Sequence, residues 1–179
     1  MIRVAEFTEG DAYRQLGGLR DLLLDAVAGG ASVSFMAGLT LAEAEDFWIE
    51  AIEGIPFGRT CLFAAMEGSR LLGAVLLHPC PKPNQPHRAD VAKLLVLGSA
   101  RRRGVASALM DALEERALQL GRTLLTLDTV TGSGAEPFYG GRGYIAAGVI
   151  PDYALMPDGA FCATTIYYKR LDGGSASQP

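Results

Sequence analysis

Apolar and polar residues follow two different periods along this chain, and these periods divide it into strands and helices. Residues 2–7 alternate between the two kinds, which predicts a strand with one buried face. Apolar residues then recur at helical spacing over residues 16–27 and 41–55. Asp11 and Thr40 are placed to cap these two helices, and a Gly-Gly pair follows the first, so two helices are expected before the next strand.

Six more strands and two more helices are expected in the rest of the chain. Apolar or alternating runs predict strands at residues 61–66, 71–78, 90–97, 123–129, 144–150 and 161–171. Helical spacing predicts a long helix over residues 103–120 and a short one over residues 135–141. The order is that of a mixed α/β fold with about seven strands and about four helices. It forms one domain over residues 1–171, and residues 172–179 are expected to be a flexible tail.

The composition narrows the classes of function. Apolar residues make up 49% of the 179 positions and charged residues 20%, which excludes a disordered chain. The net charge of −4 provides no overall basic field, so no nucleic-acid partner is expected. The longest uncharged segment, residues 26–42, is too short and too rich in glycine and serine to span a membrane. The first residues lack the apolar core of a signal peptide, so a cytoplasmic location is expected.

The cysteines and histidines predict neither a disulfide framework nor a metal site. Cys61, Cys80 and Cys162 are odd in number and far apart, which indicates reduced core residues. His78 and His87 flank a proline-rich segment, and no spacing of Cys and His matches a zinc site. No metal cofactor is therefore expected.

The candidate chemistry lies where the strand at residues 90–97 runs into the helix at residues 103–120. Three consecutive arginines, residues 101–103, precede Gly104 at the start of this helix. The first amides of a helix lack intrahelical partners and face the positive end of its dipole, so this turn is a candidate anion site. A solvated basic turn is the alternative. The chain contains neither G-x-x-x-x-G-K-S/T nor G-x-G-x-x-G, which disfavours P-loop and Rossmann folds.

Two motifs resemble those of the GNAT acetyltransferase superfamily. Residues 101–106 (RRRGVA) match its acetyl-CoA signature, R/Q-x-x-G-x-G/A, at the expected strand-to-helix junction. Residues 135–144 (AEPFYGGRGY) match its second landmark, A-x-x-F/L-Y-x-x-x-G-F/Y, and the order of elements agrees from residue 2 to residue 171. Further stretches resemble the tabtoxin-resistance type, which acetylates an amine of a small, amino-acid-like β-lactam toxin: GASVSFMAGL, KLLVLGSARRRGVASALMDALEERA, GRTLLTLDT, GVIPDYALMPDG and YYKRL.

The resemblance implies a mostly antiparallel central sheet whose fourth and fifth strands splay apart in a V to take acetyl-CoA as co-substrate. The pantetheine arm is expected to pair with the fourth strand at Leu95, Val96 and Leu97. The residues implied to hold the pyrophosphate are Arg102, Arg103, Gly104, Val105, Ala106 and Ser107. The chain departs from the usual pattern at Gly132, where an asparagine is common. It departs again at Gly98 and Ala100, where Pro and Tyr or His are common.

Three residues are implied to carry the transfer. Tyr139 matches the tyrosine near the thioester sulfur and is expected to protonate the departing thiolate, since the ordinary pKa values of thiol and phenol, about 8.5 and about 10, are close. Asp128 and Asp90 match acidic residues that face the acceptor, and water is a further candidate base. An aspartate within LLTLDT independently suggests function, because burial without a partner is costly. The alternatives are a core tyrosine and aspartates that cap loops.

Acceptor contacts are expected from the first two helices and a late loop, at Ser32, Phe35, Asp152 and Tyr153. The predicted function is direct transfer of acetyl from acetyl-CoA to the amine of a small, polar, amino-acid-like molecule, such as a toxin or antibiotic. The predicted partner is this small-molecule amine, and a monomer or homodimer is expected. Two alternatives stay open: a protein or peptide N-acetyltransferase, and a non-catalytic acyl-CoA-binding sensor.

Overall fold

A seven-stranded sheet runs through the molecule in the order β1-β2-β3-β4-β5-β7-β6. A computed structural model describes residues 1–171, so the predicted tail at residues 172–179 lies outside the described residues. Every neighbouring pair is antiparallel except β4 and β5, which are parallel. This confirms the predicted mixed, mostly antiparallel sheet. The strands are β1 (Ile2–Phe7), β2 (Cys61–Glu67), β3 (Arg70–Pro79), β4 (Arg88–Val96), β5 (Leu124–Val130), β6 (Ile145–Leu155) and β7 (Phe161–Arg170).

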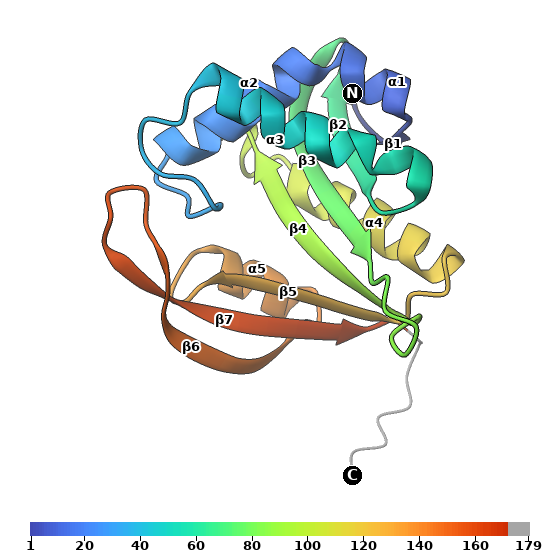
Figure 1. Cartoon of the computed structure of the whole chain (residues 1–179), viewed down its shortest axis with the longest axis vertical. Helices are drawn as coiled ribbons and strands as arrows, with labels where there is room; N and C mark the ends of the chain where they lie inside the picture. The colour runs from blue at the N-terminus through green and yellow to red at the C-terminus, as the bar shows by residue number, and fades with distance from the viewer. Residues whose placement is uncertain (172–179) are drawn as a thin grey trace.

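Helices cover both faces of the sheet and create two hydrophobic cores. The helices are α1 (Glu9–Arg14), α2 (Leu16–Ala28), α3 (Leu41–Glu53), α4 (Val105–Gln119) and α5 (Ala135–Gly141), with 3-10 turns at Ile55–Phe57 and Gly98–Ala100. One core joins α1, α2 and α3 to the sheet, and the other joins α4 and α5 to its opposite face (Figure 1). Trp48 and Leu109 are fully buried in these two cores, as the helical spacing of their apolar stripes predicts.

Two element boundaries differ from the prediction. The helix expected to begin at Asp11 is split into α1 and α2 at Gln15, and Thr8 rather than Asp11 is its cap. Asp11 is the third helical residue, and its side chain accepts a hydrogen bond from the backbone amide of Thr8. This contact completes a capping box with Thr8. β6 continues past Pro151, because the strand lies at the sheet edge and its pairing with β7 shifts register between Ile150 and Ala154.

The parallel pair β4–β5 is short, and the two strands diverge beyond it. They pair only at Arg88–Leu124, Ala89–Leu125 and Asp90–Thr126. β4 then bulges against β3, where Lys93 takes a positive φ of 53°. Figure 1 shows the two strands together at their starts and apart at the ends of their arrows. The predicted splay between the fourth and fifth strands is thus present.

Two loops meet at the open side of this splay. The loop between α2 and α3 approaches the β6–β7 hairpin (Figure 1). The Ser32 hydroxyl donates to the Leu155 carbonyl at 2.9 Å, and the Ala37 amide donates to the Pro157 carbonyl at 3.0 Å. The two halves of the sheet are therefore joined again across the mouth. Within residues 1–171, no helix has both the length and the apolar character needed to cross a membrane.

Candidate active site

A cleft of about 940 Å³ fills the space between the splayed strands. Its walls come from β4, β5, α5, the loop between α2 and α3, and the β6–β7 hairpin. Eight of the residues predicted for the site line this one cleft: Ser32, Phe35, Leu95, Val96, Ala106, Asp128, Tyr139 and Tyr153. Residues from six parts of the sequence are thus brought to one place by the splay.

Tyr139 lines the cleft although its side chain is almost entirely buried. The side chain is 7% exposed, and its ring centroid lies 5.6 Å from that of Tyr144 and 6.2 Å from that of Tyr167. No side-chain hydrogen bond within residues 1–171 involves its hydroxyl. Burial, with the nearby Asp128 carboxylate, raises the pKa of Tyr139 to about 12. The phenol therefore stays protonated at neutral pH and is free to donate.

Asp128 offers a carboxylate without an ion-pair partner in the described part of the chain. It lies on β5 two residues beyond the last rung paired with β4, and it lines the cleft. Its one described side-chain hydrogen bond comes from the Thr164 hydroxyl at 3.3 Å. The residue is exposed to the cleft, so the expectation of a buried, costly carboxylate is wrong. The physical reason is the splay, which leaves this part of β5 uncovered by β4.

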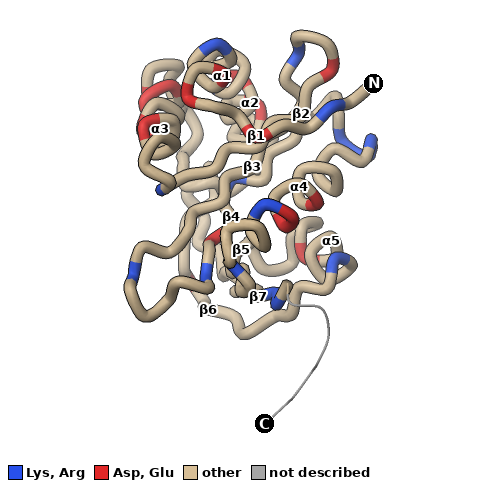
Figure 2. Tube along the Cα trace, turned by 90° about the vertical axis from the view of Figure 1, so that its right-hand side faces the viewer, with Lys and Arg blue, Asp and Glu red and all other residues tan. Residues whose placement is uncertain are grey.

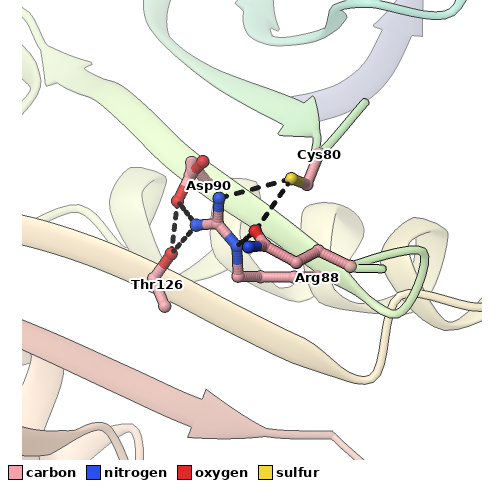
Figure 3. A network of polar contacts seen from close by, with 5 residues as sticks. Cys80, Arg88, Asp90 and Thr126 are labelled. Atoms are coloured by element: carbon pink, nitrogen blue, oxygen red, sulfur yellow. Dashed lines mark hydrogen bonds and ion pairs between the residues drawn. The ribbon is translucent and has the colours of Figure 1, made fainter. Parts of the chain in front are cut away.

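Asp90 lies at the other, paired end of the two strands. Its carboxylate accepts a hydrogen bond from the Arg88 guanidinium at 2.6 Å and another from the Thr126 hydroxyl (Figure 3). Arg88 is held in turn by Gln85 at 3.0 Å and by the Cys80 sulfur at 3.4 Å. Asp90 is not among the residues that line the cleft. The structure therefore separates the two predicted bases and gives Asp90 a cation partner of its own.

The start of α4 supplies free amides next to the cleft. Gly104 has a φ of 78° and caps α4 without any side-chain hydrogen bond. A Cβ built on Gly104 would meet nothing within 4 Å, so the space in front of these amides is open. Three arginines in a row precede α4, whereas α3 carries acidic positions and no basic ones (Figure 2). Open amides and local positive charge fit a phosphate group.

The residues predicted to hold the pyrophosphate differ in their exposure and in the contacts of their side chains. Arg103 is ion-paired with Glu67 at 2.6 Å, and Arg102 is exposed with a φ of 59°. The Val105 side chain is 2% exposed, so Val105 has its backbone amide to offer, while Ser107 is exposed.

Leu97, which was predicted to pair with the pantetheine arm, does not line the cleft, and its amide donates to the Leu72 carbonyl at 2.9 Å. Arg101, which was not predicted as a contact, does line the cleft.

Lys93 is a cleft residue that the sequence reasoning missed. Its ammonium donates to the Ser34 hydroxyl at 2.9 Å and lies 6.0 Å and 5.4 Å from the ring centroids of Phe35 and Phe47. Burial lowers the pKa of Lys93, and the carboxylate of Asp128 partly opposes this. A lysine in the middle of an apolar strand (VAKLLV) was the available signal.

Asp152 and the cysteines complete the comparison with the predicted residues. Asp152 is exposed at a φ of 50° in the irregular part of β6 and is not among the cleft-lining residues. All three cysteines are free thiols. Cys61 and Cys80 are buried as predicted, whereas Cys162 lines the cleft. Over residues 1–171, no three His, Cys, Asp or Glu side chains are grouped closely enough to hold a metal ion.

Comparison with known proteins connects this cleft to one family. The model of the acetyltransferase (GNAT) family matches residues 31–144. An N-acetyltransferase structure from Staphylococcus aureus Mu50 superposes with a TM-score of 0.80 at 18% identity, covering 96% of this chain and 99% of that one. The yncA structure from Salmonella typhimurium, solved with its cofactor acetyl-CoA, has a TM-score of 0.78 at 11% identity and covers 99% and 98%.

A third solved structure belongs to a protein with a stated protein acceptor. The ribosomal-protein-alanine N-acetyltransferase from Brucella melitensis has a TM-score of 0.76 at 18% identity, covering 94% of this chain and 99% of that one. At such low identities the likeness is one of fold. The choice of acceptor must therefore be argued from the side chains of the cleft.

Proposed function

The chain belongs to the GNAT acetyltransferase family, and we propose that it transfers the acetyl group of acetyl-CoA to the amine of a small, polar, amino-acid-like molecule. Transfer would be direct, with both substrates bound in the cleft at once. Following the resemblance to the tabtoxin-resistance type, the acceptor is a toxin- or antibiotic-like compound, and the enzyme acts in the cytoplasm as the single domain of residues 1–171.

The residues present fit acetyl-CoA as co-substrate. Beyond Asp90 the β4 edge that faces β5 is left without a strand partner, so its backbone at Leu95 and Val96 is available to pair with an amide-containing arm. The open amides beside Gly104 suit the pyrophosphate, with Arg101 and Arg102 adding charge. When bound, acetyl-CoA supplies a thioester carbonyl that an amine can attack.

The side chains of the cleft account for the protons of the reaction. The amine nitrogen forms a bond to the acetyl carbon, the carbon–sulfur bond breaks, and one proton moves from nitrogen to the sulfur side. Asp128, directly or through water, accepts the proton of the amine. Tyr139 donates its phenolic proton to the departing thiolate and recovers a proton afterwards. The observation that carries the proposal is that one cleft holds the Tyr139 phenol together with the Asp128 carboxylate, which has no ion-pair partner within residues 1–171.

The order of these proton transfers follows from the charge of Asp128. Burial, and after it the carboxylate of Asp128, raise the pKa of Tyr139 to about 12, which makes the phenol a weak acid in the resting enzyme. Once Asp128 has taken the proton of the amine, that negative charge is gone and the pKa of Tyr139 falls. Tyr139 therefore becomes a stronger acid at the stage when the thiolate needs a proton.

A small acceptor is favoured by the contact that crosses the cleft mouth. Ser32 and Ala37 bond to the hairpin at Leu155 and Pro157, and an extended peptide entering the cleft between the loop and the hairpin would have to displace these contacts. Acetylation of a protein amino terminus, as in the name of the Brucella protein, is the second candidate and would require these contacts to open. The paired presence of Tyr139 and Asp128 argues against a non-catalytic sensor.

Mass spectrometry of reactions with acetyl-CoA tests this function. The panel contains free amino acids, amino-acid-like amines such as phosphinothricin, polyamines, and peptides with free amino termini or lysines. Acetylated small amines with unmodified peptides are the expected result. Acetylated peptides alone would support the second candidate, and tight acetyl-CoA binding without any product would support the sensor.

A further inference from the structure

The cleft contains two opposite charges that do not form an ion pair with each other. Lys93 enters it from the bulge of β4, and Asp128 enters it from β5. Within residues 1–171, neither has an oppositely charged side chain within 4.0 Å. They are nevertheless near enough for the charge of Asp128 to oppose the fall in the pKa of Lys93. Each charge is thus available to a molecule bound between them.

The backbone is built to hold Lys93 in this place. Both Lys93 and its hydrogen-bond partner Ser34 have positive φ values, 53° and 75°, in a region that non-glycine residues rarely adopt. The Ser34 hydroxyl accepts from Lys93 at 2.9 Å, so its own hydrogen remains available to donate. The aromatic rings of Phe35 and Phe47 lie on the same ammonium and reduce its contact with water. The Lys93 ammonium and the Ser34 hydroxyl are therefore two hydrogen-bond donors within a partly apolar wall of the cleft.

We infer that Lys93 and Ser34 form a carboxylate-binding subsite, so that the acceptor is an amino acid whose carboxylate binds there while its amine lies toward Asp128. This inference rests on the proposed function and adds the acceptor class to it. An ammonium that has lost much of its hydration gains most from an anion, and a carboxylate accepts well from an ammonium and a hydroxyl together. The zwitterion of an amino acid can place its carboxylate against Lys93 and its ammonium against Asp128 at the same time.

The same geometry distinguishes this role from a merely structural one. If Lys93 served only to tie the loop between α2 and α3 to β4, its loss would weaken binding of every acceptor alike. A carboxylate subsite instead affects acceptors that have a carboxylate and spares those that lack it. The ratio of kcat/KM for an amino acid to that for its carboxamide is therefore the informative quantity.

The test compares matched acceptors on matched variants. The acceptors are the L-amino acid that the panel shows to be acetylated fastest, its carboxamide and its decarboxylated amine. Lys93→Met removes the charge but keeps an unbranched side chain at the positive φ. Lys93→Arg keeps the charge, and Lys82→Met removes a lysine from the exposed proline-rich loop outside the cleft.

Wild-type enzyme is expected to prefer the amino acid about tenfold to a hundredfold, the range of a hydrogen bond to a charged group. Lys93→Met should lower kcat/KM for the amino acid by that factor, mainly through KM, and change the two uncharged analogues less than about twofold. Lys93→Arg should retain most of the preference, and Lys82→Met should match wild type. Equal use of all three acceptors by wild type, or equal losses for all three in Lys93→Met, would overturn the subsite.

Binding measurements separate failure of this inference from failure of the proposed function. Calorimetry with the protein–CoA complex measures the affinity for the twenty common L-amino acids and for their carboxamides. Amino-acid binding that Lys93→Met abolishes would support the subsite even if no transfer occurred. Acetylation of other small amines, without binding of any amino acid, would overturn the subsite and leave the proposed function standing.

Discussion

The two ends of the β4–β5 pair have similar charged residues and opposite environments. At the paired end, Asp90 contacts Arg88 and Thr126, and the guanidinium of Arg88 also reaches Gln85 and Cys80 (Figure 3). At the splayed end, Lys93 and Asp128 face a cleft, and neither has an ion-pair partner within the described chain. Charges that satisfy one another hold strands together, whereas charges left for a third molecule can bind or catalyse.

The contrast between the paired and splayed ends predicts different roles for Asp90 and Asp128, the two aspartates predicted as bases. Asp90 and Asp128 are both acidic residues near the same parallel strands, and sequence resemblance places both at the acceptor. In the structure the last paired rung, Asp90–Thr126, separates them: one lies inside a polar network and the other lies beyond it. We therefore expect substitutions at the splayed end to change the rate and those at the paired end to change stability.

The largest effect is expected from Tyr139→Phe, which removes the proton donor at the splayed end and keeps the ring packed on Tyr144 and Tyr167. General acid catalysis contributes about 10²–10⁴-fold, so kcat should fall by that range while acetyl-CoA affinity changes little. Because the pKa of Tyr139 is about 12, the wild-type kcat should show no fall from Tyr139 ionisation below pH 9. Steady-state kinetics from pH 6 to pH 9 measure both expectations.

The matched control is Tyr144→Phe, which removes a neighbouring phenol that does not line the cleft. Its kcat should equal that of wild type. A Tyr139→Phe enzyme with full rate and an unchanged pH profile would remove Tyr139 from the role of acid and leave water as the donor.

Asp128→Asn is expected to have the next largest effect, because it removes the acceptor of the amine proton. At pH 7 we expect kcat/KM to fall about 10²-fold, at the low end of general base catalysis. The loss should shrink as the pH rises toward 9, since more of the acceptor is then the free amine and needs no base. Asp46→Asn on the exposed surface of α3 is the control. A raised KM with an unchanged kcat profile would make Asp128 a binding residue instead.

Gly104→Glu extends the comparison to the helix that begins beside the splayed end. The substitution puts a carboxylate in front of the open amides of α4, so acetyl-CoA affinity should fall at least about tenfold. Gly58→Glu is a matched control, because Gly58 also has a positive φ, 66°, and open space around it. Both variants carry the strain of a left-handed residue, about 1–2 kcal/mol, so equal losses of stability are expected. Unchanged acetyl-CoA affinity in a folded Gly104→Glu protein would contradict the proposed cofactor site.

Local patterns in the sequence predicted most of the fold. The helical stripe ending at Gly121 and the alternation at Ile2–Phe7 lie close to the observed α4 and β1, because each depends on one period and nearby caps. The break at Gln15 was not predicted, since the apolar stripe of α2 and the residues of α1 form one continuous helical pattern. The extension of β6 past Pro151 depends on pairing with β7, which no local pattern encodes.

The site was predicted from resemblance to family motifs, and a residue to which no motif gave a role was missed. Tyr139 and the start of α4 belong to short signatures, so their numbers could be read directly. Lys93 reaches the cleft only because β4 bulges and β5 turns away, and both events depend on long-range pairing. The ion pair between Arg88 and Asp90 was also missed, although the two residues lie only two positions apart on β4. The hydrogen bond from Thr126 to Asp90 could not be predicted locally, because the parallel register of β4 and β5 brings Thr126 beside it.

The smallest effect is expected at the paired end, from Asp90→Asn. The Arg88–Asp90 pair is partly exposed, with 26% and 46% of the two side chains accessible, so its contribution to the free energy of unfolding is about 1 kcal/mol. For a chain of 179 residues this corresponds to a Tm lower by about 2–4 °C. The kcat should stay within about twofold of wild type, because the carboxylate lies outside the cleft lining.

A double-mutant cycle with Arg88→Met determines whether this small effect belongs to the paired network. Arg88→Met removes the contacts to Gln85, Asp90, Thr126 and Cys80 together, so it should destabilise more than Asp90→Asn. If Asp90 acts through Arg88, the double variant loses less than the sum of the single losses, since the shared contact can be lost only once. Thermal unfolding and kcat are measured on all four proteins. A large fall in kcat for Asp90→Asn at unchanged Tm would instead make Asp90 part of the chemistry, and the contrast between the two ends of the strands would fail.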